Sequence, residues 1–161
     1  LPVRFLSGPL DVGRSAFYSR LTAEIEGVLK RILGGGGAEL IDETWSQYEG
    51  VRLAGMHWSI LSKSQWVTWA ERVGPERMHA LVSYIVRTGF RETAGFPDLV
   101  WVSGHINTMI ECFPRRFRMQ PEFLEVKSPN DKMSCRQHLW MDRLHRMGFV
   151  VEQLSIEDEL P

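Results

Sequence analysis

The sequence predicts an α/β domain in which a central mixed sheet is flanked by helices and preceded by a mainly helical N-terminal half. Apolar residues recur at helical spacing through much of residues 16–88. Two β-rich runs follow, Leu99–Val102 and Phe123–Val126, separated by a long loop. A helical pattern over residues 133–147 and a third apolar run at residues 149–154 complete the chain. The predicted order is therefore strand, long loop, strand, helix, strand.

The N-terminal half is predicted to consist of helices joined by short connections. Ser15 is placed to cap the first helix, and a glycine run at residues 34–37 ends it. That run indicates a loose connector, because the Gly-Lys-Ser/Thr ending of a phosphate-binding loop is missing. Further helices are expected at residues 38–48, 64–73 and 75–88. Their expected core residues are Trp66, Trp69, Met78, Leu81, Val82 and Ile85.

Composition indicates a globular chain with no strong bias. With 161 residues, 43% hydrophobic and 24% charged, it can bury one core and is expected to form one compact domain. The net charge of −1 gives no overall basic signal, so any DNA contact would have to be local. Cys112 and Cys135 lie far apart, which favours a reducing compartment over a zinc site or a disulfide framework. No membrane-spanning run or signal peptide is present, and the missing initiator methionine suggests a fragment of a longer protein.

Two acidic residues and a lysine adjoin the predicted strands. Side chains two apart in a strand share a face, so Glu125 and Lys127 are expected to be neighbours. Leu124 and Val126, which alternate with them along the strand, would face the core. If Asp98 begins an adjacent strand, two carboxylates and an ammonium converge, which suits a hard divalent cation with a bound water. Alone, Glu-x-Lys is often a solvated ion pair and Pro-Asp a common turn, but their place beside strand patterns favours a metal-dependent phosphodiesterase site.

The segment after the lysine is predicted to turn and enter a helix. Residues 128–131 form a turn in which Asn130 or Asp131 can cap the helix, and Gly148 ends it. Gln137 lies on the apolar stripe of this helix. It is either an ordinary amide at the edge of the core or, as we favour, a group that reaches a metal-bound water or a phosphate.

These motifs together resemble a known family. The run Gly95-Phe96-Pro97-Asp98-Leu99-Val100-Trp101, the run from Glu125 to Ser134, and Gln137 with Trp140 are similar to the VRR-NUC branch of the PD-(D/E)XK nucleases. Within that branch the likeness is strongest to the Fanconi-associated nucleases, whose "APLDL…F…R" and "W…EG…W" patterns are similar to residues 8–20 and 45–58. The resemblance spans nearly the whole chain. Ser128 departs from the usual glycine, and the segment between residues 104 and 120 is longer than in the family.

The resemblance implies a restriction-endonuclease-like fold, with residues 1–90 leading into a VRR-NUC core at residues 91–161. The implied catalytic residues are Asp98, Glu125, Lys127 and Gln137. Asp98, Glu125 and the main-chain carbonyl of Val126 would bind Mg²⁺ or Mn²⁺. Lys127 would orient or help to deprotonate the attacking water and stabilise charge on the phosphate.

The function implied by the resemblance is a structure-specific DNA nuclease, of the 5′-flap endonuclease and 5′–3′ exonuclease type, in interstrand-crosslink repair. Its partners would be branched or flap DNA and other repair proteins, in the nucleus of a eukaryote or the cytoplasm of a bacterium. The family also uses a metal-binding glutamate and basic elements upstream of its "APLDL" segment, so upstream domains are expected to be needed. The alternatives are a junction-resolving or restriction-type nuclease of the same fold, or an inactive DNA-binding module.

Two basic features are candidate DNA contacts. Arg115, Arg116 and Arg118 lie beside Phe113 in the long loop and mix cations with an aromatic side chain, as single-strand binders do, although such clusters are usually solvated. Lys132, expected at the start of the last helix, could meet a phosphate. The five histidines show no metal-ligand spacing.

Overall fold

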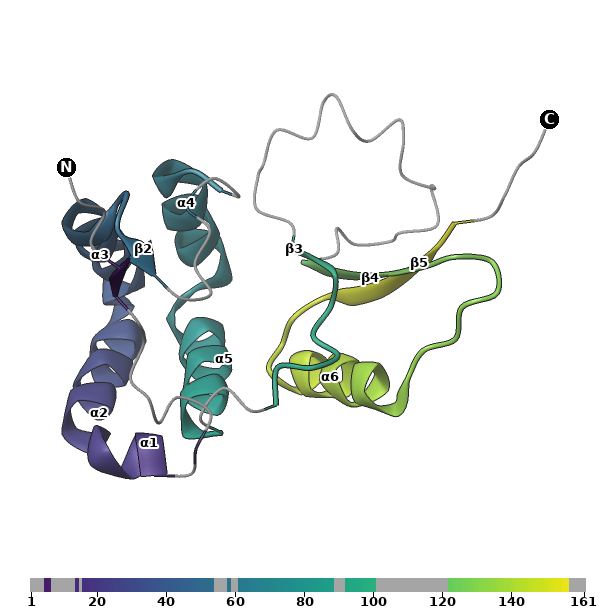
Figure 1. Ribbon diagram of the computed structural model, residues 1–161, viewed down its shortest axis with the longest axis horizontal. Coiled ribbons are helices and arrows are strands. Elements are labelled where there is room, and N and C mark those ends of the chain that lie inside the picture. Colours follow the sequence, from purple (N-terminus) through teal and green to yellow (C-terminus); the bar gives the residue numbers. More distant parts are fainter. Residues whose placement is uncertain are drawn as a thin grey trace. The chain divides into compact units, whose positions relative to one another are not determined.

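A computed structural model describes residues 5–6, 14, 16–53, 58, 61–88, 92–100 and 122–156 (Figure 1). The chain divides into two compact units, residues 1–92 and residues 93–161. The first unit is mainly helical and the second carries a mixed three-stranded sheet with a helix. These features confirm the predicted fold class. Within the described residues, no helix is both long and apolar enough to cross a bilayer.

The first unit holds the predicted helices close to their expected bounds. They are α1 (Ala16–Arg20), α2 (Thr22–Arg31), α3 (Gly37–Tyr48), α4 (Lys63–Val73) and α5 (Pro75–Arg87). The single helix expected from Ser15 is broken at Leu21 into α1 and α2, and Ser15 itself lies outside the described residues. Two short strands, β1 (Phe5–Leu6) and β2 (Arg52–Leu53), pair in parallel. Of the predicted core residues, Trp69, Met78 and Leu81 are buried, whereas Trp66, Val82 and Ile85 are half-buried.

The glycine run at residues 34–37 is a helical joint, and the prediction of a loose connector was wrong. A π-helical turn, η1 (Ile32–Gly36), links α2 to α3, and the kink falls at Gly35, whose φ of 91° favours glycine. Gly37 is buried, and a Cβ there would meet the Met78 sulfur at 2.6 Å. A positive φ therefore explains Gly35, and close packing on α5 explains Gly37.

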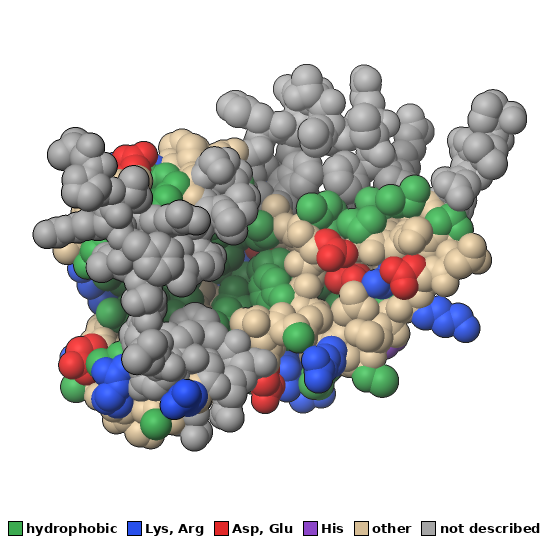
Figure 2. Space-filling model, in the orientation of Figure 1, with side chains coloured by type: hydrophobic (Ala, Val, Ile, Leu, Met, Phe, Trp, Pro, Cys, Tyr) green, Lys and Arg blue, Asp and Glu red, His purple; other side chains and the backbone are tan. Residues whose placement is uncertain are grey.

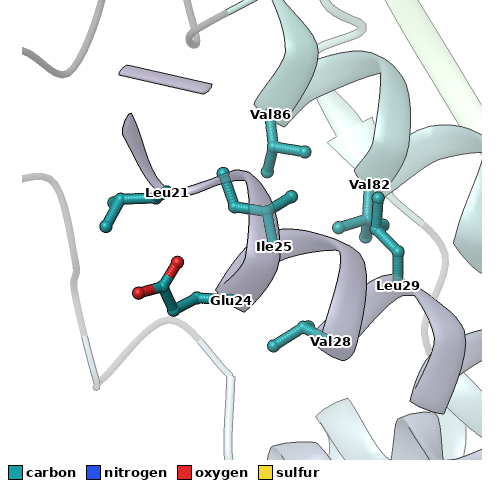
Figure 3. A pocket seen from close by; sticks show the side chains of 7 residues that line it. All are labelled: Leu21, Glu24, Ile25, Val28, Leu29, Val82 and Val86. Carbon is teal, nitrogen blue, oxygen red and sulfur yellow. The ribbon is translucent and has the colours of Figure 1, made fainter. Parts of the chain in front are cut away.

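An apolar groove runs between α2 and α5 (Figure 3). Its lining consists of Leu21, Ile25, Val28 and Leu29 from α2 and Val82 and Val86 from α5, with Glu24 as the one charged residue. Val28 remains 44% exposed, whereas Leu29 is 1% exposed. The α2–α5 contact therefore buries one side of the apolar stripe of α2 and leaves the other side in the open groove.

The second unit carries the predicted strand, strand, helix, strand order. β3 (Leu99–Val100) pairs antiparallel with β4 (Phe123–Lys127), which pairs in parallel with β5 (Val151–Ser155). α6 (Cys135–Arg146) connects β4 to β5 and packs along the sheet (Figure 1). Two parallel strands need such a crossover, because the chain must return from the end of the first strand to the end at which the second strand starts.

An aromatic cluster joins α6 to the sheet. The Phe96 ring stands edge-on to Phe123 and Trp140, with centroid distances of 5.3 and 5.0 Å, and Phe149 meets Phe123 at 5.1 Å. Trp140 is 1% exposed and Leu144 is fully buried, so the core of this unit lies between α6 and the sheet. The segment that leads into β3 is thereby anchored from both sides.

The start of α6 differs from the prediction. The N-cap is Ser134, and neither Asn130 nor Asp131 serves that role. Ser134 and Gln137 form a capping box, in which each side chain bonds the main-chain amide of the other residue. Lys132, expected to begin this helix, therefore lies before it. Reciprocal capping at Ser134 outcompetes a cap placed several residues earlier, because it satisfies two amides at the helix start.

Candidate metal centre

Glu125 and Lys127 lie on the same face of β4, as strand alternation requires. The Lys127 Nζ atom is 2.9 Å from Glu125 Oε1, and the two residues are 5% and 1% exposed. This pair is buried, so the alternative of a solvated surface ion pair was wrong. Burying two charges costs more desolvation free energy than an exposed pair does, and stability alone is a poor reason to keep such a pair.

Asp98 reaches β4 through the register of the antiparallel pair. Leu99 lies opposite Leu124, which sets the preceding Asp98 opposite Glu125. The Asp98 Oδ2 atom accepts a hydrogen bond from the Val126 main-chain amide at 3.0 Å. The N–H and C=O of one strand residue point to the same edge, so the Val126 carbonyl faces the edge where Asp98 lies. The structure thus brings Asp98, Glu125 and the Val126 carbonyl to neighbouring positions.

Gln137 contacts the Glu125 carboxylate directly. Its Nε2 atom donates a hydrogen bond to Glu125 Oε1, and its Oε1 atom accepts one from the Ser134 main-chain amide at 2.8 Å. We expected this side chain to reach a water or a phosphate. In the structure it bonds the Glu125 carboxylate and the Ser134 amide, so both its nitrogen and its oxygen have protein partners, and its contact with a water or a phosphate stays a prediction.

The two oxygens of Glu125 differ sharply in their surroundings. Oε1 receives hydrogen bonds from both Lys127 and Gln137. Oε2 is buried and has no hydrogen-bond partner among the described residues. A buried carboxylate oxygen without a donor is costly, and a bound cation would remove that cost.

The donor set fits a hard divalent cation. Mg²⁺ and Mn²⁺ prefer carboxylate and carbonyl oxygens, which are the groups that Asp98, Glu125 and Val126 offer. Within the described residues, no group of three or more His, Cys, Asp or Glu side chains is arranged to hold a metal ion. The protein donors identified at this site are therefore two carboxylates and one main-chain carbonyl.

The charge state of Lys127 follows from its neighbours. The hydrogen bond to Glu125 raises the pKa of Lys127 above its ordinary value, and the negative charges of Glu125 and Asp131 act in the same direction. The Asp131 Oδ2 atom lies 3.4 Å from the Nζ atom. Lys127 is therefore an ammonium at neutral pH, a cation held beside the free oxygen of Glu125.

The remaining sequence candidates are less closely tied to the site. Lys132 is exposed and precedes α6, and Arg115, Arg116 and Arg118 lie outside the described residues. Sequence reasoning did not single out Ser134 as the residue that fixes Gln137. The Ser-x-x-Gln spacing of a capping box was the available signal. Acidic and basic side chains lie side by side on the surface of this unit (Figure 2).

Comparison with known proteins agrees with this geometry. The model of the VRR-NUC domain matches residues 36–156. The chain is 26% identical to the Fanconi-associated nuclease 1 homolog of Oryza sativa, over 95% of this chain and 15% of that protein. It is 27% identical to the Fanconi-associated nuclease 1 of Danio rerio, over 89% of this chain and 14% of that protein. The chain therefore spans about a seventh of the length of these relatives.

A solved structure shares the fold. The crystal structure of paFAN1 bound to 5′-flap DNA with a gap superposes with a TM-score of 0.75 at 18% identity, over 96% of this chain and 26% of that one. At this identity the likeness concerns the fold. The family match covers residues 36–156, most of the chain, and includes every candidate site residue from Asp98 to Gln137. The resemblance noted in the sequence is thereby confirmed, and the chain belongs to the VRR-NUC domain family.

Proposed function

We propose that this chain is the catalytic domain of a DNA nuclease that depends on a divalent metal ion, Mg²⁺ or Mn²⁺. The observation that carries the proposal is the buried Oε2 atom of Glu125, which has no hydrogen-bond partner among the described residues. The other oxygen of this carboxylate meets the Lys127 ammonium, and Asp98 lies opposite Glu125 in the strand pair. A cation site beside a fixed positive charge suits the metal-assisted hydrolysis of a phosphodiester.

Each side chain has a distinct role in this proposal. Asp98, Glu125 and the Val126 carbonyl hold the ion. The ion, when bound, would act as a Lewis acid and lower the pKa of a water bound to it. Gln137 keeps the Glu125 carboxylate turned so that Oε1 faces its two donors and Oε2 faces outward from them.

Lys127 acts as a cation. Its raised pKa favours a role in orienting the water and stabilising the charge that grows on the phosphate, rather than a role in taking up a proton. Asp131, which is exposed, holds the ammonium from the other side. Both carboxylates thus restrain Lys127 at the site.

The substrate we propose is branched DNA with a 5′ flap, cut by endonuclease or 5′–3′ exonuclease action during interstrand-crosslink repair. The support is the names of the relatives, which are Fanconi-associated nucleases, and the flap DNA bound to paFAN1. In a eukaryote the protein would act in the nucleus. A junction-resolving nuclease of the same fold would cut four-way junctions in preference to flaps, and an inactive binding module would cut neither.

Substitution of the three charged residues tests the proposal. We expect Asp98→Ala, Glu125→Ala and Lys127→Ala each to abolish cleavage of flap DNA by the chain, or by a longer protein that contains it, with Mg²⁺ or Mn²⁺ present. The matched control is Asp142→Asn, which removes an exposed carboxylate of α6 that forms an ion pair with Arg146. Circular dichroism checks that each variant folds. Unchanged turnover in Glu125→Ala would exclude the assigned site.

A further inference from the structure

The turn before Asp98 touches the first turn of α6 through a glycine. The Phe96 main-chain amide donates to the Thr93 carbonyl at 3.1 Å, and Gly95 within this turn has a φ of 87°. A Cβ atom on Gly95 would stand 2.8 Å from the Arg136 carbonyl carbon and 2.9 Å from the Gln137 amide nitrogen. Both are main-chain atoms, which cannot rotate aside as a long side chain would.

Gly95 touches the part of α6 whose Gln137 side chain bonds the Glu125 carboxylate of β4. Gln137 belongs to the first turn of α6, and its side chain donates to Glu125 Oε1. The Ser134 amide fixes which end of the Gln137 amide group faces the carboxylate, because it bonds the Gln137 oxygen and leaves the nitrogen for Glu125. A shift of this turn would therefore move the donor away from Glu125.

We propose that Gly95 and Ser134 are positioning residues for the Glu125 carboxylate. Gly95 lets the turn before Asp98 rest on the main chain of α6, and Ser134 orients the Gln137 amide that this turn presents. The same contact ties the segment bearing Asp98 to the helix that holds Glu125, so it fixes the two carboxylates relative to each other. The consequence for metal binding rests on the proposed function.

The hydrogen bonds behind a metal ligand affect the affinity for the metal. Loss of such a partner costs about 10- to 100-fold in affinity or activity. Gln137 supplies one of the two hydrogen bonds to Glu125 Oε1. Displacement of Gln137 should therefore weaken Mn²⁺ binding by about 10-fold or more, even where the chain remains folded.

Two glycine variants separate this role from ordinary backbone strain. Gly74 also has a positive φ, 79°, but nothing lies within 4 Å of the Cβ it lacks. Gly95→Ala and Gly74→Ala therefore both place a side chain at a positive φ, and only Gly95→Ala collides with α6. We would record the side-chain amide resonances of Gln137 in the metal-free chain and the Mn²⁺ affinity by calorimetry.

Gly95→Ala should move the Gln137 amide resonances toward those of a free amide and weaken Mn²⁺ binding by about 10-fold or more. Gly74→Ala should change neither. The proposal is overturned if Gly95→Ala leaves the resonances in place or if Gly74→Ala moves them equally. Failure of the wild-type chain to bind Mn²⁺ would count against the proposed function, whereas the resonances report the positioning without metal.

A second pair of variants covers the case in which Gly95→Ala does not fold. Ser134 has a φ of −71°, which proline adopts, and Ser134→Pro removes the amide that bonds Gln137. Ser134→Ala also loses the hydroxyl cap but keeps that amide. We expect the Gln137 resonances to shift in Ser134→Pro far more than in Ser134→Ala. Equal shifts in both variants would show that the Ser134 amide does not orient Gln137.

Discussion

Binding of Mn²⁺ should stabilise the chain, and Glu125→Gln should remove that stabilisation. In the metal-free chain the buried Oε2 atom of Glu125 has no hydrogen-bond partner among the described residues. A buried group left in this state costs about 1–3 kcal/mol. A cation that binds this oxygen relieves the cost only in the folded state, because unfolding separates Asp98 from Glu125.

The size of the effect follows from linkage. A ligand that binds only the folded state adds about 2.7 kcal/mol at a concentration 100 times its Kd. For a chain of 161 residues, each kcal/mol moves Tm by about 2–4 °C, so we expect a rise on the order of 5–10 °C. In Glu125→Gln the second oxygen becomes an amide nitrogen, which cannot bind a cation, and the rise should vanish.

Thermal unfolding followed by circular dichroism, over a Mn²⁺ titration, measures this effect. Asp142→Asn is the control, because its carboxylate is 51% exposed and its loss should change stability by no more than about 0.5 kcal/mol. Its Mn²⁺-dependent rise in Tm should equal that of the wild type. A Glu125→Gln chain whose Tm still rises with Mn²⁺ as the wild type does would refute the assignment of Oε2 as a metal ligand.

Three further outcomes are expected. Ca²⁺ should compete with Mg²⁺ for the oxygen site but support little cleavage, because its looser coordination positions a water poorly; competition assays on flap DNA measure this. Because folding raises the pKa of Lys127, the stability that its charge contributes is fully present below the pKa of the unfolded chain and is lost as the pH rises through the pKa of the folded chain. The free energy of unfolding should therefore fall less steeply with alkaline pH in Lys127→Met than in the wild type. Trp140→Ala should cost about 3–5 kcal/mol in denaturant unfolding because this ring is 1% exposed, whereas the exposed His138→Ala should change stability by less than about 0.5 kcal/mol.

Much of the fold could be predicted because it depends on local patterns. Helical periodicity and proline at a first helical position gave α5 within one residue of its observed end. The glycine run at residues 34–37 was misread in part because the close packing of Gly37 depends on Met78, which is distant in sequence. A pattern within one segment carries no information about a contact of this kind.

The candidate site was predicted in part for the same reason. Alternation along β4 is local, so the neighbourhood of Glu125 and Lys127 could be predicted, and it was confirmed. The hydrogen bond from Gln137 to Glu125 was not predicted, because the start of the helix was placed too early, at Asn130 or Asp131. With Ser134 as the cap, Gln137 falls in the first turn, where its amide can bond both Ser134 and Glu125.

The position of Asp98 depends on packing more than on the sheet. Within the described residues, β3 pairs with β4 through two residues, and so short a ladder holds this segment weakly. The Phe96 ring between Phe123 and Trp140 and the contact of Gly95 with α6 supply the missing restraint. The aromatic core therefore helps to position the Asp98 carboxylate. Loss of the Phe96 ring should loosen Asp98. An equal loss of apolar area in α2 should leave the spacing of the Asp98 and Glu125 carboxylates unchanged.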